Sequence, residues 1–442
     1  MSPRLRLLVP ALLVALVVGA GVLLANPFPT VAPHASAGAT NRGSGGPGSG
    51  TDGSGGPGGP SGGPPADQPT PRPEQGGTEL YGFLPYWQMS DSMATYLRSA
   101  ELSTLTLFSV SARRSGALNT RDIGYSRIIG AIGRRLIDEA HARGTRVELG
   151  FTSFGGERNG ILFGRLAPSS SAAPSPLASP AAPVSPAAPA PWHRTVVELV
   201  ALAADLGVDG INVDVELLDP DDRGAYGEFL AALRGALVAA LPDAQVSVDT
   251  EAGPRGVANA AEASAAGVDR LFLMGYDYHW SGSAPGASSP IDRSDGLYSL
   301  RWSIDRYVEA GVPRDRIILG LPLYGMSWQT TGPDRTAPVI GRGSTWVPAQ
   351  HLDVLLSGDF RAGRDVLEVA DFFVTPDGDN WRITYFDSPG TLRPKLALAR
   401  DNGLAGAGFW ALGYERGLPG YLELMAAFRA GEVAREEAPP RP

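Results

Sequence analysis

Three polar residues near the middle of the sequence, Asn212, Asp214 and Glu216, alternate with apolar ones. On a β-strand this alternation turns all three polar side chains to one face, and burying such a face is unfavourable unless its groups are hydrogen-bonded or functional. Asp214 and Glu216 would lie about 7 Å apart along the strand, close enough for one carboxylate to raise the pKa of the other. A carboxylic acid that stays protonated beside a charged one can protonate the leaving oxygen of a glycosidic bond. The competing interpretation is a solvated strand end that carries incidental acids.

Around these residues the sequence repeats one unit, which consists of a short apolar strand, a turn and an amphipathic helix. Strands are expected at residues 80–84, 105–110, 146–151, 210–216, 245–249, 270–275, 316–321 and 406–411. Helices are expected between them, at residues 126–143, 194–206, 223–241, 300–310, 392–402 and 421–430. Alternating strands and helices are typical of a parallel sheet, and eight repeats over this length predict a (β/α)8 TIM barrel. A doubly wound open sheet is the alternative, but no G-x-G-x-x-G follows the first strand.

One segment departs from this repeat. After the seventh expected strand, residues 327–386 contain strand-like pieces at 364–374 and 381–386 where a helix is due. We therefore expect a small α+β insertion there. Loops that follow barrel strands lie at the C-terminal face, where the active sites of such barrels are found, so the insertion would deepen a groove at that face.

The N-terminus predicts export. Arg4 and Arg6 precede an uncharged apolar run from Leu7 to Ala25, which suits either a cleaved signal peptide or an uncleaved membrane anchor. Both keep the positive charges inside and carry the rest of the chain outward. Residues 1–37 are thus expected to be a signal peptide or signal anchor, and the protein to be extracellular or held at the cell surface by a membrane tether.

Two segments are too rich in small residues and proline to form a core. Residues 38–78 hold 15 Gly and 8 Pro and are expected to form a flexible linker. Residues 167–191 alternate Ala, Pro and Ser and predict a loop insert, which either modulates access to the groove or, as we favour, is merely tolerated. The barrel is accordingly expected over residues 79–430, followed by a disordered tail at 431–442.

Composition argues against several classes of function. The formal net charge is −9 and no basic run interleaves with aromatic residues, so a nucleic-acid partner is not expected. The absence of cysteine from the sequence excludes thiol catalysis and zinc–thiolate sites. Five histidines without an H-E-x-x-H pattern do not predict a metal centre. We expect neither a metal nor a cofactor.

Four motifs lie on or directly after expected strands. They are Asp209–Glu216 (DGINVDVE), Ser153–Gly156 (SFGG), Met274–Asp277 (MGYD) and Trp410. In this order they resemble the D-G-x-D-x-D-x-E, S-x-G-G and M-x-Y-D motifs and the sugar-site tryptophan of glycoside hydrolase family 18. That family contains chitinases and endo-N-acetylglucosaminidases, and many members carry an α+β insertion after the seventh strand.

The resemblance implies a retaining hydrolysis without a protein nucleophile, in which the 2-acetamido oxygen of the substrate attacks the anomeric carbon. Glu216 would be the acid and then the base, Asp214 would orient the acetamido group, and Tyr276 would hydrogen-bond to it. The residues expected to bind substrate are Asp277, Met274, Trp410, Asn212 and Trp87. The partner implied is an N-acetylglucosamine-containing polysaccharide, and we expect the protein to act as a monomer.

One residue departs from the family pattern, because Asn212 stands where the family has Asp. The chain shares this Asn with spore-cortex and peptidoglycan N-acetylglucosaminidases, which places peptidoglycan-type glycans slightly ahead of chitin. The alternative function is a non-hydrolytic sugar-binding protein on the same barrel, since relatives that lose the catalytic Glu become lectins. The presence of Glu216, Asp214 and Tyr276 favours catalysis.

The interpretation of four further residues rests on their position alone. Trp87 follows the first expected strand and either stacks on sugars or packs at the rim. Asp249 and Glu251 end the fifth expected strand. They could line the groove, but acids of a turn are the interpretation that we favour. Asp209 lies off the inward-facing positions and is expected to hold the turn before its strand.

Overall fold

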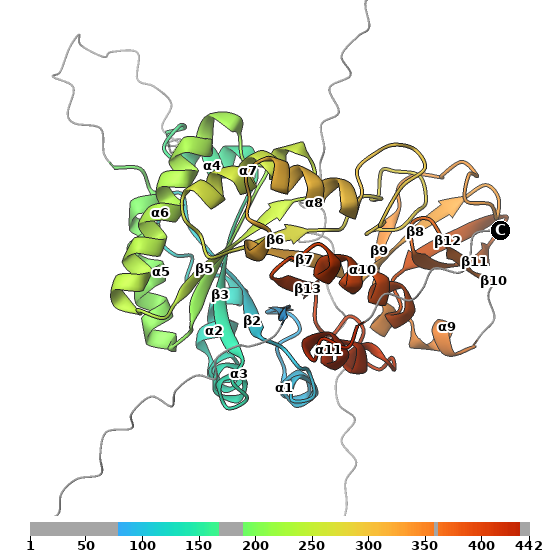
Figure 1. Cartoon of the computed structure of the whole chain (residues 1–442), viewed down its shortest axis with the longest axis horizontal. Coiled ribbons are helices and arrows are strands. Elements are labelled where there is room, and N and C mark those ends of the chain that lie inside the picture. The colour runs from blue at the N-terminus through green and yellow to red at the C-terminus, as the bar shows by residue number, and fades with distance from the viewer. Residues whose placement is uncertain (1–77, 168–188, 358–360, 434–442) are drawn as a thin grey trace, which may run out of the picture. The chain divides into compact units, whose positions relative to one another are not determined.

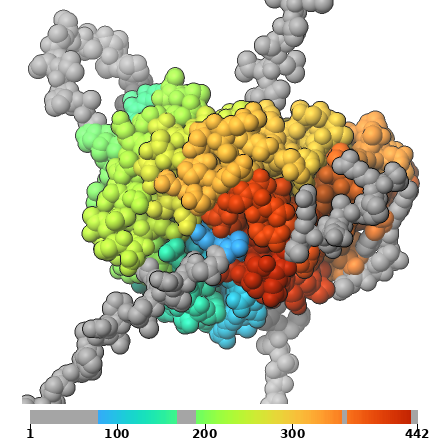
Figure 2. Space-filling view, viewed as in Figure 1, coloured from blue at the N-terminus to red at the C-terminus, as the bar shows by residue number. Residues whose placement is uncertain are grey.

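The computed structural model describes residues 78–167, 189–357 and 361–433. At its centre is a closed barrel of eight parallel strands, in the order β1-β13-β7-β6-β5-β4-β3-β2 (Figure 1). The last strand closes the barrel between the first and the seventh, and Figure 2 shows the blue N-terminal segment next to the red C-terminal one. The strands are β1 Glu79–Pro85, β2 Thr104–Ser111, β3 Arg146–Phe154, β4 Gly210–Glu216, β5 Gln245–Glu251, β6 Arg270–Met274, β7 Ile317–Pro322 and β13 Gly406–Trp410. The predicted (β/α)8 barrel is confirmed.

Helices cover the outside of the barrel because each carries an apolar face. In α5, for example, Val196, Leu199, Ala203 and Leu206 recur at helical spacing and are buried. The helices in the barrel connections are α1 Asp91–Leu97, α2 Ile123–Ile129, α3 Ala131–His141, α4 Gly156–Leu162, α5 Trp192–Leu206, α6 Arg223–Ala240, α7 Pro254–Ala265, α8 Leu300–Glu309, α10 Pro389–Asp401 and α11 Tyr421–Arg429.

The single helix expected over residues 126–143 is two helices, α2 and α3. They are separated at Gly130, whose backbone is extended. The chain then comes so close to itself that a Cβ on Gly133 would lie 1.9 Å from the carbonyl oxygen of Ile128. Two glycines therefore allow a sharp change of direction that apolar periodicity alone does not reveal.

The barrel interior divides into an aromatic part and a polar part. Tyr81, Phe83, Phe108, Phe272 and Ile318 form an apolar cluster of their own inside the barrel. The inward positions of β3, β4 and β5 carry acids and amides instead, and the outward positions of β4 (Ile211, Val213 and Val215) belong to the larger core beneath the helices. The alternation read from the sequence of β4 therefore describes its two faces correctly.

A second, antiparallel sheet follows β7, with the strand order β10-β11-β12-β8-β9 (Figure 1). Its elements are β8 Gly325–Thr330, β9 Ser344–Trp346, α9 Leu352–Ser357, β10 Arg361–Asp365, β11 Ala370–Asp377 and β12 Asn380–Phe386. The predicted insertion after the seventh strand is confirmed.

The prediction of one strand-like piece at 364–374 was wrong, because the chain forms a hairpin there. The chain turns between β10 and β11, where the carboxylate of Asp365 accepts the backbone N–H groups of Leu367 and Glu368. A short polar side chain that caps its own turn in this way is a local reversal signal, but apolar Val366 and Leu367 obscure it in the sequence.

Several expectations lie largely or wholly outside the described residues. They are the signal segment at 1–37, the linker at 38–78, the loop insert at 167–191 and the tail at 431–442. Within the ranges that the structure describes, no helix is long and apolar enough to cross a membrane.

The packing of Phe272 against glycines of neighbouring strands predicts a stability effect. A Cβ on Gly320 would lie 2.4 Å from the buried Phe272 ring, so Gly320→Ala is expected to destabilise the fold by about 1–3 kcal/mol through overpacking. Gly224→Ala is the matched control, because that glycine lies in α6 and a Cβ there meets nothing within 4 Å. Thermal unfolding should show a lower Tm for Gly320→Ala only; equal Tm values for the two variants would contradict this packing.

Candidate active site

The carboxyl groups of β4 lie where the barrel opens at the C-terminal ends of its strands. Asp214 is 3% exposed, whereas Glu216, the last residue of the strand, is partly exposed. Burial, followed by the charges of Asp249 and Glu251, raises the pKa of Asp214 well above its usual range. Burial also raises the pKa of Glu216, and the charges of Asp214, Glu251 and Asp277 add to it. Glu216 is thus a proton donor in reach of solvent.

The two acids of β5 belong to the same cluster, so the favoured interpretation of them as turn acids was wrong. Asp249 is 4% exposed and lies directly opposite Asp214 in the register of β4 and β5. Its Oδ1 accepts a hydrogen bond from Asn212 Nδ2 at 2.8 Å. Glu251 accepts the backbone N–H of Leu217 at 3.3 Å, just beyond the end of β4.

The signal for these acids was present in the sequence. In β5 the polar residues Ser247, Asp249 and Glu251 occupy every second position, with Val246 and Val248 between them. This repeats the pattern of β4, and the period of two predicts that all three side chains share the inward face. The strand expected at residues 245–249 is two residues shorter than β5, which extends to Glu251.

The cluster as a whole is suited to proton transfer. Four buried or nearly buried carboxyls face one another across two adjacent strands, and each carries a raised pKa. Like charges so close together cannot all be ionised, so protons are shared among them. Among the described residues, no group of three or more His, Cys, Asp or Glu side chains is arranged to hold a metal ion.

The S-x-G-G motif fixes the end of β4. Ser153 donates to Asn159 Oδ1 at 2.7 Å, and the Asn159 amide donates to the backbone carbonyl of Glu216 at 2.7 Å. The Gly155 N–H donates to the same carbonyl at 3.2 Å. Gly155 has a φ of 99°, a conformation that favours glycine. The motif therefore holds the backbone that carries the predicted acid.

The residues after β6 bring Tyr276 and Asp277 to the same cluster. The charges of Asp249, Asp214 and Glu216, added to burial, raise the pKa of Tyr276, so its hydroxyl stays protonated and can donate a hydrogen bond. Asp277 has a φ of 60° and accepts a hydrogen bond from the Tyr324 hydroxyl at 2.5 Å. Burial raises the pKa of Asp277 against the opposing hydrogen bonds of Tyr324 and Ser288.

Met274 and Trp410 pack against the aromatic cluster inside the barrel. The Trp410 ring lies 4.6 Å from the Phe108 ring and 6.4 Å from the Trp87 ring, measured between centroids. Trp87 is partly exposed and its Nε1 donates to the Tyr414 hydroxyl at 3.3 Å. Trp87 and Trp410 thus form one continuous aromatic surface at the mouth of the barrel.

Asn212, expected to bind substrate, is fully buried and lies beneath the acids. It is 0% exposed, and its Nδ2 donates to Ser247 Oγ at 3.0 Å as well as to Asp249. The side chain lies one inward position below Asp214, under the acids. Its role is therefore to hold neighbouring polar groups.

Asp209 holds the turn before β4, as expected. Its carboxylate accepts the backbone N–H of Val147 at 2.8 Å and contacts His141 Nε2 at 2.8 Å.

Sequence reasoning did not identify Tyr324. It lies two residues after Pro322, the last residue of β7. A polar residue just past the C-terminal end of a barrel strand is a candidate site residue, so the signal was its position alone.

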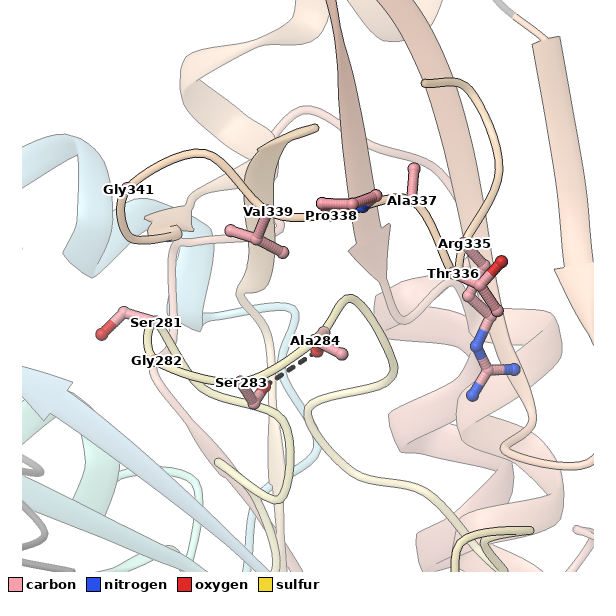
Figure 3. Close-up of a pocket in the computed structure, with 10 residues that line it drawn as sticks. All are labelled: Ser281, Gly282, Ser283, Ala284, Arg335, Thr336, Ala337, Pro338, Val339 and Gly341. Carbon is pink, nitrogen blue, oxygen red and sulfur yellow. Dashed lines mark hydrogen bonds between the residues drawn. The ribbon is translucent and has the colours of Figure 1, made fainter. Parts of the chain in front are cut away.

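A cavity of about 310 Å³ lies beside the insertion (Figure 3). Its walls are the loop after β6 and the loop after β8, and Arg335 lies at one end. That guanidinium is paired with Asp365 and Glu368. None of the lining residues belongs to a barrel strand, so the cavity is separate from the acid cluster.

Comparison with known families agrees with this geometry. A model of glycosyl hydrolases family 18 matches residues 153–415, which is more than half of the chain and runs from the last two residues of β3 through β13. The chain belongs to glycosyl hydrolases family 18. The prediction of a glycosidase family, made from the motifs, is confirmed.

Individual relatives within family 18 are distant. "Endochitinase 1" of Metarhizium robertsii is 29% identical over 50% of this chain and 56% of its own length. "Cortical fragment-lytic enzyme" of Bacillus subtilis is 29% identical over 50% of each chain. The solved structure of the spore cortex-lytic enzyme SleL from Bacillus cereus covers 79% of this chain and 74% of that one, with a TM-score of 0.59 and 18% identity, which bears on the fold alone. The chain thus spans about half the length of these curated relatives.

The hydrogen bond from Tyr324 predicts a change in the pKa of Asp277. In Tyr324→Phe the charged carboxylate loses a donor, so the pKa of Asp277 is expected to rise further and the group to take up its proton at higher pH. An NMR titration with ¹³C-labelled aspartate measures this directly. Tyr298→Phe, at an exposed tyrosine, is the control and should leave the titration unchanged. An identical Asp277 titration in Tyr324→Phe and the wild type would contradict the assignment.

Proposed function

We propose that this protein is an exported glycosidase that cleaves β-linked glycans containing N-acetylglucosamine, by a retaining, substrate-assisted mechanism. Membership of family 18 and the names of its relatives, which include chitinases and cortical fragment-lytic enzymes, support the substrate class. The observation that carries the proposal is the position of Glu216 at the mouth of the barrel, one inward position beyond the buried Asp214, where burial and nearby charges raise the pKa of Glu216.

The proposed first step breaks the glycosidic bond. Glu216 gives its proton to the leaving oxygen while the carbonyl oxygen of the substrate's 2-acetamido group attacks the anomeric carbon and forms an oxazolinium ion. Asp214 orients the acetamido group and stabilises its developing positive charge. Tyr276, whose raised pKa keeps its hydroxyl as a donor, hydrogen-bonds to the same group.

The second step restores the acid. Glu216, now ionised, takes a proton from water as the water oxygen attacks the anomeric carbon, and the oxazolinium ring opens. Two displacements at one carbon leave the configuration retained. Asp277 binds the sugar at the cleavage site, and the remaining predicted contacts come from Met274, Trp410 and Trp87.

The aromatic surface suits this substrate. Trp410 and Trp87 offer adjacent, partly exposed rings at the mouth of the barrel, and the apolar face of a pyranose packs well on such rings.

We place bacterial cell-wall glycans slightly ahead of chitin as the substrate. Asn212 and the residues after Tyr276, Asp277–Trp280 (DYHW), resemble the spore-cortex branch of the family, and three of the relatives are cortical fragment-lytic enzymes.

Export is proposed from the sequence of residues 1–37, as a cleaved signal peptide or a retained anchor. In either case the barrel would meet glycans outside the cytoplasm, which agrees with a cell-wall substrate.

The central test removes the proposed acid. Glu216→Gln keeps the size of the side chain but cannot deliver a proton, so release of reducing ends from chitin oligomers and from peptidoglycan should fall by roughly 10²- to 10⁴-fold. Glu228→Gln, at an exposed position on α6, is the matched control and should retain full activity. Equal activity in Glu216→Gln and the wild type would remove Glu216 from its assigned role. Sugar binding without turnover in the wild type would instead support the alternative of a non-hydrolytic sugar-binding protein.

A further inference from the structure

A second polar layer lies inside the barrel beneath the candidate acids, and its centre is Glu148 of β3. The side chain is 0% exposed. Its Oε2 accepts a hydrogen bond from the Ser247 hydroxyl at 2.6 Å, and its Oε1 accepts one from Gln245 Nε2 at 2.5 Å. Room for this side chain comes from Gly210, which pairs with Glu148 across the sheet and where a Cβ would lie 3.1 Å from Glu148 Cγ.

The hydrogen bonds of this layer have a fixed direction. An ionised carboxylate can only accept, so Ser247 must donate its hydroxyl proton to Glu148. Ser247 Oγ is then an acceptor on its other side, where Asn212 Nδ2 donates to it at 3.0 Å. The same amide nitrogen donates its second hydrogen to Asp249. Glu148, through Ser247, and Asp249 thus together set the orientation of the Asn212 amide.

This orientation leaves the amide oxygen pointing away from both partners. Asn212 Oδ1 is buried and has no hydrogen-bond partner among the described residues, and the same holds for Asp214 Oδ1, one inward position higher on β4. Burial raises the pKa of Asp214, which favours its protonated form, and in that form the carboxyl can donate a hydrogen bond. An acceptor and a donor, each without a partner in the described structure, lie at neighbouring inward positions of one strand.

We propose that Glu148 is a positioning residue for Asp214, acting through the Ser247 hydroxyl and the Asn212 amide. It keeps the amide oxygen, and not the amide N–H groups, available to the Asp214 carboxyl. This inference rests on the proposed function, in which Asp214 orients the acetamido group. It also explains how Asn can stand at position 212, since an amide is useful there only when its orientation is set.

The charges around Glu148 make this chain of hydrogen bonds sensitive to pH near neutrality. Burial raises the pKa of Glu148 to about 7, against the hydrogen bonds of Ser247 and Gln245. The titratable and charged groups that bear on it, directly or through a neighbour, are Glu79 and Tyr81 of β1, Arg146 of β3, Asp249 of β5 and Arg270 of β6. Below about pH 7 Glu148 takes up a proton and no longer fixes the direction of the Ser247 hydroxyl.

The test is the Glu148→Gln variant of the full chain, assayed on chitin oligomers and peptidoglycan over a range of pH. Glutamine keeps the shape but places an NH2 donor where one of the two accepting oxygens lies, so one of the donors Ser247 and Gln245 loses its acceptor. We expect kcat to fall roughly ten- to a hundredfold above neutral pH, with KM changed little. The ratio of wild-type to variant kcat should approach one as the pH falls below about 7. A merely structural role would lower kcat by the same factor at every pH, and that result would overturn the proposal.

The Ser247→Ala variant provides the matched control. If Glu148 acts through Ser247, Ser247→Ala should show the same loss of kcat, and the double variant should lose no more than either single one. Losses that multiply in the double variant would overturn the proposed route.

Should Glu148→Gln fail to fold, full activity of Ser247→Ala would still overturn the proposed route. A wild type that hydrolyses neither glycan would refute the proposed function, and the inference with it, whereas an active wild type with an unaffected Glu148→Gln refutes the inference alone.

Discussion

Carboxyl groups from β3, β4 and β5 lie inside a closed barrel, where burial opposes their ionisation. Burial is the largest cause of the raised pKa of Glu148, Asp214, Glu216 and Asp249, and their mutual repulsion adds to it. The fold tolerates this cluster because protons neutralise some of the carboxyls and because Ser, Asn and Gln side chains hydrogen-bond to others. The same burial that makes the cluster costly favours the protonated forms of its acids. The proposed chemistry follows from this environment.

The barrel keeps these acids together through strand register. Asp214 and Asp249 are direct partners across β4 and β5, and the S-x-G-G motif holds the carbonyl of Glu216 from the neighbouring strand. The opposite side of the interior is aromatic, which allows Trp410 to lie at the mouth with its body packed on Phe108. An acidic wall and an aromatic wall thus face each other across one opening.

Period-two alternation was enough to predict the faces of β4, and repetition of strand and helix was enough to predict the barrel. The same alternation continues through β5, but a strand that is expected to end at residue 249 leaves Glu251 in a turn. The depth of Asn212 in the barrel is hidden for a related reason. The sequence places it on the inward face but does not tell how deep in the barrel that position lies. The roles of Tyr324 and Glu148 depend on Asp277 and Ser247, which lie far along the chain. Local pattern therefore marks Tyr324 only by its position after β7 and does not reveal what either residue contacts.

The most direct measurement is the protonation state of Glu216 in the free protein. An NMR titration with ¹³C-labelled glutamate, assigned by comparison with Glu216→Gln, reports its carboxyl pKa. A carboxyl that remains protonated at neutral pH and titrates well above the usual value for Glu, about 4.3, agrees with the account. Titration of Glu216 near that usual value would contradict it, because the group would then hold no proton to donate.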